Sequence, residues 1–187
     1  YAVLILPPVP RSLDSLAPLM LGYCIAAFFR CKKLDVGIKW PNDLILGGRK
    51  VGGILLEERK GTLLAGVGLN LHSCPGPEAL REEHAVPAGY LKAAGFDATP
   101  LGLWRELVDF VKTCYETALI QGTPEDVAAL VEPLLCWVGQ DVSVREGGSP
   151  PWTGRLAGLA SDGALRVEPA GGAGERLLTS GSIWRAS

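Results

Sequence analysis

Short apolar runs, separated by glycines and polar turns, fill the amino-terminal part of the chain. The first run, residues 1–6, is apolar at both alternating sets of positions, so we expect a strand buried on both faces. Further strand-like runs follow at 36–40, 44–46, 51–56 and 63–71. Gly47 and Gly48 lie between two of them, and paired glycines are typical of a tight hairpin. The pattern predicts an antiparallel meander centred on this hairpin.

Helical patterns interrupt and follow this meander. One helix is expected to start at a capping residue within 12–15 and to end near residue 31. Its uncharged part, 16–29, is shorter than the roughly 20 residues that cross a bilayer, so we predict a buried core helix and no membrane partner. Two more helices should begin at the Thr-Pro pairs 99–100 and 123–124, because threonine caps a helix and proline suits its first turn.

The pattern changes again after Cys136. Short runs at 142–144, 154–159, 165–167 and 176–184 alternate with glycine and proline turns, which is typical of a small β-barrel. We therefore expect two domains, 1–136 and 137–187. The predicted fold class is α/β (α+β): a mixed, mostly antiparallel sheet backed by helices, followed by the barrel.

The composition excludes several classes of protein. With 187 residues and a net charge of −2, the chain is not expected to bind nucleic acid or another polyanion. Its five cysteines show no CxxC spacing and no histidine at ligand spacing, so no protein-held metal is predicted. The chain opens within a strand-like run and without methionine, so we expect that further residues precede Tyr1 in the natural protein.

The hairpin carries the most informative chemistry. Lys50 precedes Gly52 and Gly53, and glycines inside a strand usually mark close approach of a ligand or another backbone. Asn42 and Asp43 alone would be ordinary turn residues. Together these residues predict a site for an anion that contacts the backbone, although an isolated strand lysine is more often only solubilising.

Three motifs in this region occur together: KWPND at 39–43, KVGGILLE at 50–57 and GVGLN at 66–70. In this order and spacing they resemble the catalytic domain of biotin protein ligases, whose core is similar to that of class II synthetases. Residues 154–167 and 180–185 are similar to the SH3-like carboxyl-terminal domain of the same family. The resemblance covers nearly the whole chain.

The resemblance implies a cytoplasmic ligase that uses ATP and Mg2+. Such an enzyme activates biotin as biotinyl-5'-AMP and transfers it to a lysine of a biotin carboxyl carrier protein, an acetyl-CoA carboxylase subunit. Some members dimerise by pairing sheet edges, so a homodimer is among the expected assemblies. Lys50 is implied as the catalytic lysine that bridges the carboxylate and the α-phosphate. Asp43 is implied either to orient Lys50 or to receive the incoming amine.

The remaining site residues also come from the resemblance. The implied biotin-binding residues are Lys50, Gly53, Leu55, Gly66 and Gly68. The implied adenylate-binding residues are Lys39, Asn42, Asn70 and Arg185.

Two elements of the family are absent from the sequence: an S-[ST]-N segment and the arginine-glycine loop that precedes the strand matched by residues 1–6. We therefore expect this chain alone to be a poor catalyst. A related lipoate-type ligase and a biotin-sensing module without catalysis are the alternatives. Trp40 and the predicted carboxyl-terminal barrel favour biotin over lipoate.

Overall fold

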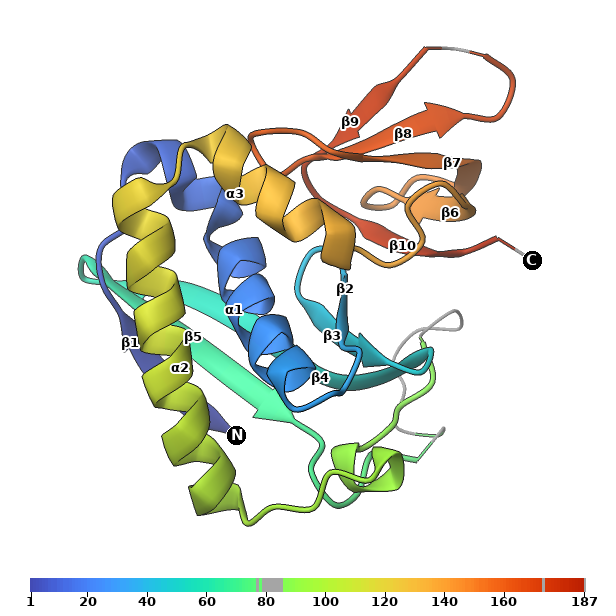
Figure 1. Ribbon diagram of the computed structural model, residues 1–187. Helices are drawn as coiled ribbons and strands as arrows, with labels where there is room; N and C mark the ends of the chain where they lie inside the picture. The colour runs from blue at the N-terminus through green and yellow to red at the C-terminus, as the bar shows by residue number, and fades with distance from the viewer. Residues whose placement is uncertain (77, 79–85, 173, 187) are drawn as a thin grey trace.

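The computed structural model describes residues 1–76, 78, 86–172 and 174–186, and its strands form two antiparallel sheets (Figure 1). The first sheet has the strand order β1-β5-β4-β3-β2. Its strands are β1 (Ala2–Leu6), β2 (Gly37–Lys39), β3 (Asp43–Leu46), β4 (Arg49–Arg59) and β5 (Thr62–Leu69). The predicted meander is confirmed. Gly47 and Gly48 have φ values of 56° and 73°, the left-handed conformation that a two-residue hairpin requires.

Helices cover one face of this sheet (Figure 1). The helices of the described residues are η1 (Arg11–Leu16), α1 (Ala17–Cys31), η3 (Leu91–Ala94), α2 (Pro100–Gln121), α3 (Pro124–Val131) and η4 (Glu132–Leu134). Helix α1 packs on the sheet, and α2 and α3 pack against α1. The predicted caps at Thr99 and Thr123 are confirmed, since each hydroxyl accepts a hydrogen bond from a backbone N–H three residues later. The expected cap within 12–15 is wrong. A 3-10 turn leads into α1, and Leu16 takes the cap position without a side-chain bond.

The first helical stretch packs as a core element. By length and composition, residues 11–31 could cross a membrane, but 67% of the most apolar window is buried inside the protein. At Gly22, an added Cβ would meet the side chains of Ile38 and Ile54 at 3.5 and 3.7 Å. Helix α1 therefore lies directly on the first sheet, as predicted for a core helix.

The opposite face of the first sheet is not covered by these helices. In the edge strand β1, Leu6 is buried, whereas Val3 and Ile5 are 66% and 75% exposed. The prediction that this strand is buried on both faces is therefore wrong. An apolar run shows that a strand can be buried on both faces. Whether it is buried depends on the layers that pack beside it.

The second sheet has the order β10-β6-β7-β8-β9. Its strands are β6 (Asp141–Arg145), β7 (Trp152–Leu159), β8 (Leu165–Pro169), β9 (Arg176–Leu178) and β10 (Ser182–Arg185). The expected single strand at 176–184 is split, and Gly181 lies at the break with a φ of 127°. Among the described strands, no pairing of β9 with β10 closes this sheet into the predicted barrel. The division into domains at residue 136 stays a prediction.

The segment between β5 and α2 rejoins the first sheet. Residues 77 and 79–85 of this segment lie outside the described residues. Ala88 forms a parallel bridge with Lys50, and the Lys50 amide donates to the Pro87 carbonyl at 2.8 Å. The loop thus returns beside the hairpin that carries the candidate chemistry.

Candidate functional site

The uncovered side of the first sheet, which we call the open face, gathers most of the predicted site residues. Cross-strand partners in a sheet lie on the same side, so the strand register assigns this face directly. Its three rows are Asp43 with Gly53 and Gly68; Val3 with Gly66 and Leu55; and Ile5 with Leu64 and Glu57. Glycines therefore lie beside Asp43 in the first of these rows and between Val3 and Leu55 in the second. We call Gly53, Gly66 and Gly68 the glycine trough.

Lys50 reaches this face through an irregularity in β4. Lys50 pairs with Ile45 and Gly52 with Leu44, which leaves Val51 as an extra residue in a β-bulge. In a regular strand, Lys50 and Gly53 would point to opposite faces. The bulge restores Lys50 to the side of Gly53, as bulges commonly redirect a side chain.

Two lysines meet one carboxylate beside the trough. The Nζ of Lys50 lies 2.5 Å from Oδ1 of Asp43, and the Nζ of Lys39 lies 3.5 Å from Oδ2. The side chains of Asp43 and Lys39 are 15% and 14% exposed, whereas that of Lys50 is 42% exposed. The cluster carries one excess positive charge, and Lys50 is its most accessible member. It can therefore attract an anion placed over the trough.

The glycines of the hairpin and trough serve different purposes. A Cβ at Gly52 would stand 2.6 Å from the Gly68 carbonyl oxygen, so Gly52 allows two strands to approach. A Cβ at Gly53 would stand 3.4 Å from Oδ1 of Asp43 and 3.7 Å from Nζ of Lys50, directly under the ion pair. At Gly66, the nearest atoms are 3.7 Å away, so the surrounding protein does not require a glycine there.

One aromatic side chain joins the trough without having been predicted from the sequence. A Cβ at Gly68 would stand 2.7 Å from Cε1 of Tyr1, so this ring lies on Gly68. Tyr1 is otherwise fully exposed. The alternation of β1 could have indicated it, since Tyr1, Val3 and Ile5 share a side, but the expectation of two buried faces concealed that signal.

The two predicted asparagines act on the backbone. The Nδ2 of Asn42 donates to the Ile54 carbonyl at 2.7 Å, and the Ile54 amide donates back to the Asn42 carbonyl. The Nδ2 of Asn70 donates to the carbonyls of Lys50 and Gly89 at 3.3 and 2.9 Å. These bonds hold Lys50 and the returning loop in place. Adenylate contact by either asparagine stays a prediction.

Arg185 is placed apart from this cluster. It lies at the end of β10 in the second sheet, is exposed, and is paired through its backbone with Val142. Among the described residues, no ion pair or side-chain hydrogen bond joins it to Lys50 or Asp43. Its predicted role toward phosphate stays untested.

The described residues do not form a resident metal site. No group of three or more His, Cys, Asp or Glu side chains lies close enough in the described ranges to hold an ion. Both carboxylate oxygens of Asp43 already face lysines. The residues present therefore do not fit a protein-held Mg2+ ion.

Comparison with known proteins identifies the region that carries this site. Residues 20–73 match the model of the Biotin/lipoate A/B protein ligase family, and they include the two lysines, Asp43 and the glycine trough. Over these residues the chain is similar to this family. The resemblance based on the three motifs is thereby confirmed at the level of the family.

Named relatives extend the ligase likeness beyond that region. The chain is 26% identical over 157 residues to a biotin–[acetyl-CoA-carboxylase] ligase of Paracoccus denitrificans, covering 80% of this chain and 62% of the relative. It is 25% identical over 143 residues to the bifunctional ligase/repressor BirA of Bacillus subtilis, covering 72% and 42%. The chain thus spans less than two thirds of either relative.

Solved structures share the fold of the first sheet with its helices and of the second sheet. A biotin protein ligase from Aquifex aeolicus, in complex with biotin and ATP, matches with a TM-score of 0.79 and 23% identity. The match covers 98% of this chain and 77% of that chain. The predicted α/β fold with a carboxyl-terminal β unit is therefore confirmed.

Proposed function

We propose that this chain is part of a cytoplasmic biotin protein ligase that activates biotin with ATP and passes it to a carrier-protein lysine. The observation that carries the proposal is the Lys50–Asp43 ion pair, which lies over Gly53 beside an open trough of glycines. This arrangement provides a cation next to exposed glycine backbone, which is bordered by the apolar side chain of Leu55 and the ring of Tyr1. It suits a compact, uncharged ring system whose tail ends in a carboxylate.

In the proposed first step, a carboxylate oxygen of biotin attacks the α-phosphorus of ATP, and the bond to pyrophosphate breaks. The reaction brings two anionic groups together, so a positioned cation lowers its barrier. Lys50 has the accessible ammonium group, and Lys39 adds a second positive charge behind Asp43. No nucleophile of the enzyme is required.

In the proposed second step, the amine of a carrier lysine attacks the biotinyl carbonyl, and AMP leaves. The amine must lose a proton, and Asp43 is the carboxylate nearest to Lys50 in the described cluster. Asp43 would either accept this proton or hold Lys50 in place. An Asp43→Asn variant that still forms adenylate but fails to transfer it would assign the first of these roles.

The proposed binding of ATP does not require a metal ion held by side chains of this chain. Mg2+ is commonly bound through substrate phosphates with few protein ligands. We propose that any Mg2+ enters with ATP.

The decisive experiment uses the full-length protein with ATP, radiolabelled biotin and a carrier domain. Labelled biotinyl-adenylate followed by labelled carrier is expected; an unlabelled carrier under saturating conditions would refute the ligase. Binding of biotin without formation of adenylate would favour the biotin-sensing alternative. Because ligands that bind the native state raise its stability, a comparison of Tm with biotin and with lipoate separates the two ligase types. We expect biotin alone to raise Tm.

A further inference from the structure

A hydrogen bond attaches the charged turn, residues 39–43, to the second sheet. Trp40 is buried, and its indole Nε1 donates a 3.0 Å hydrogen bond to the carbonyl oxygen of Gly163. Gly163 lies in the turn that joins β7 to β8. A buried indole N–H without an acceptor is costly. The second sheet thus supplies the acceptor that Trp40 uses.

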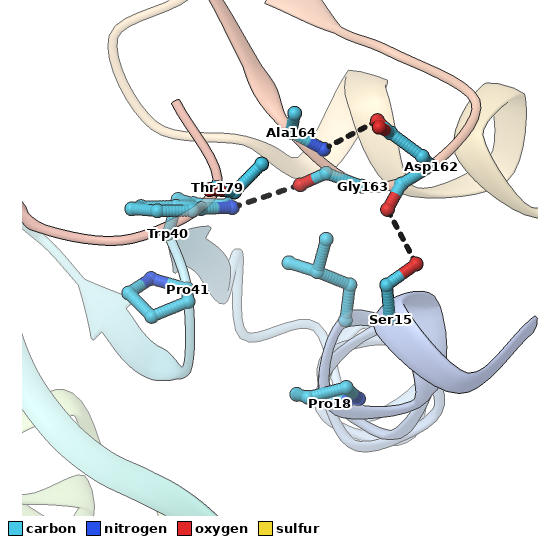
Figure 2. A pocket seen from close by; sticks show the side chains of 9 residues that line it. Ser15, Pro18, Trp40, Pro41, Asp162, Gly163, Ala164 and Thr179 are labelled. Carbon is cyan, nitrogen blue, oxygen red and sulfur yellow. Dashed lines mark hydrogen bonds between the residues drawn. The ribbon is translucent and has the colours of Figure 1, made fainter. Parts of the chain in front are cut away.

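Figure 2 shows this contact at the edge of a cavity of about 240 Å3 between the two sheets. Trp40 and Pro41 border the cavity on one side, and Ser15 and Asp162 border it on another. A cavity leaves the neighbouring side chains without packing partners on one side. Trp40 is itself only 4% exposed, so its hydrogen bond to Gly163 adds a fixed direction to the packing of the indole.

The other attachments of the turn are to the first sheet and to the segment that follows η4, where the Cys136 amide donates to the Ile38 carbonyl at 2.8 Å. The turn joins the three-residue strand β2, at the edge of the sheet, to β3, and Lys39 pairs with Asp43 across it. Asn42 ties the turn to β4 through Ile54, on the side of the first sheet. Trp40 is the attachment to the second sheet. A displacement of Trp40 within so short a turn would move Lys39 and Asp43 with it.

We propose that Trp40 is a positioning residue, whose bond to Gly163 lets the second sheet set the place of Lys39 and Asp43 relative to Lys50. The inference rests on the proposed function, because it concerns the reaction assigned to that cluster. The second sheet then contributes to biotin activation without touching biotin. Small misplacements of reacting groups can cost about 100-fold in rate, so a modest shift of the turn is sufficient.

The test compares two variants that each remove one hydrogen bond to the turn between β7 and β8. Trp40→Phe removes the indole donor to Gly163. Ser15→Ala removes the bond from the Ser15 hydroxyl to the Asp162 carbonyl, 2.6 Å in length, which does not involve residues 39–43. In the full-length protein, we expect Trp40→Phe to lower kcat of adenylate formation about tenfold, with less than a threefold change in KM for biotin. We expect Ser15→Ala to stay within twofold.

A readout without catalysis keeps this inference separate from the proposed function. Hydrogen exchange of the backbone amides of residues 37–46 should accelerate in Trp40→Phe and not in Ser15→Ala. If the wild-type protein forms no adenylate, the proposed function fails, and the exchange result still decides whether Trp40 holds the turn. Replacing Trp40 with benzothienylalanine, which keeps the bicyclic shape without the N–H, repeats the test if Phe impairs folding. Wild-type exchange, wild-type kcat, or equal losses in both variants would overturn the inference.

Discussion

The two faces of the first sheet are built from the same strands and have opposite uses. On the face beneath α1, Ile54 is 3% exposed; its neighbour Leu55, on the open face, is 59% exposed. The same contrast divides two adjacent glycines. Gly52 lies against the Gly68 carbonyl, whereas Gly53 lies under the ion pair of Lys50. Residues one position apart therefore differ in their surroundings: one packs inside the protein, and the other borders the proposed biotin site.

Ile54 and Leu55 allow the most direct test of this contrast. Ile54→Ala removes a buried side chain and leaves a cavity, which costs about 2–5 kcal/mol of unfolding free energy. Leu55→Ala should change stability by about 0.5 kcal/mol or less, as exposed substitutions usually do. Urea unfolding of both variants measures the difference, and calorimetric titration with biotin should show weakened binding for Leu55→Ala. Equal destabilisation would mean that the open face is covered in solution.

A substitution of Lys50 tests the proposed chemical role of the open face. Lys50→Ala should lower the rate of adenylate formation about 10²–10³-fold, the usual result of removing a group that stabilises developing charge. Its side chain is 42% exposed, so Tm should change little. Lys112→Ala, on the exposed side of α2, is the matched control and should leave both quantities unchanged. A full rate in Lys50→Ala would remove the central residue of the proposed mechanism.

The same substitution, glycine to alanine, tests packing on one face and ligand binding on the other. Gly52→Ala places a Cβ 2.6 Å from a carbonyl oxygen, so we expect a loss of about 1–3 kcal/mol from overpacking. Gly66→Ala meets nothing closer than 3.7 Å and should be neutral in stability. If biotin lies on the trough, Gly66→Ala should nevertheless weaken biotin binding, measured by titration. A neutral effect on both quantities would place the ligand elsewhere.

The contrast also shows what the sequence could predict. The hairpin at Gly47 and Gly48 and the caps at Thr99 and Thr123 were predictable, because each depends on a turn or capping group within a few residues. The exposure of one face of β1 was not predictable, because Val3 and Ile5 are as apolar as Leu4, which is half-buried, and Leu6, which is buried. Only the position of the helical layer separates the two sets.

The sequence predicted which residues form the candidate site, but it predicted less of how they are arranged. The three motifs placed Lys50, Asp43 and the trough glycines together, and the structure brings these residues to one face. The bulge at Val51 had no sequence signal, because a one-residue change in register depends on the partner strand. The bonds of Asn70 to Lys50 and Gly89 likewise depend on a loop that returns from later in the chain.

Among the substitutions at buried positions, the smallest effect on stability is expected for Tyr115 in helix α2. The buried hydroxyl of Tyr115 has no hydrogen-bond partner among the described residues, so Tyr115→Phe should raise the free energy of unfolding by about 1 kcal/mol. Burial, with a smaller effect of Cys24, raises the pKa of Tyr115 above its usual value. The folded protein therefore keeps this proton at a pH where the unfolded chain, with a pKa of about 10, has lost it. Stability falls as pH rises through that range. The advantage of Tyr115→Phe in thermal unfolding should accordingly widen above pH of about 10, and a destabilised variant at neutral pH would show that the hydroxyl has a partner.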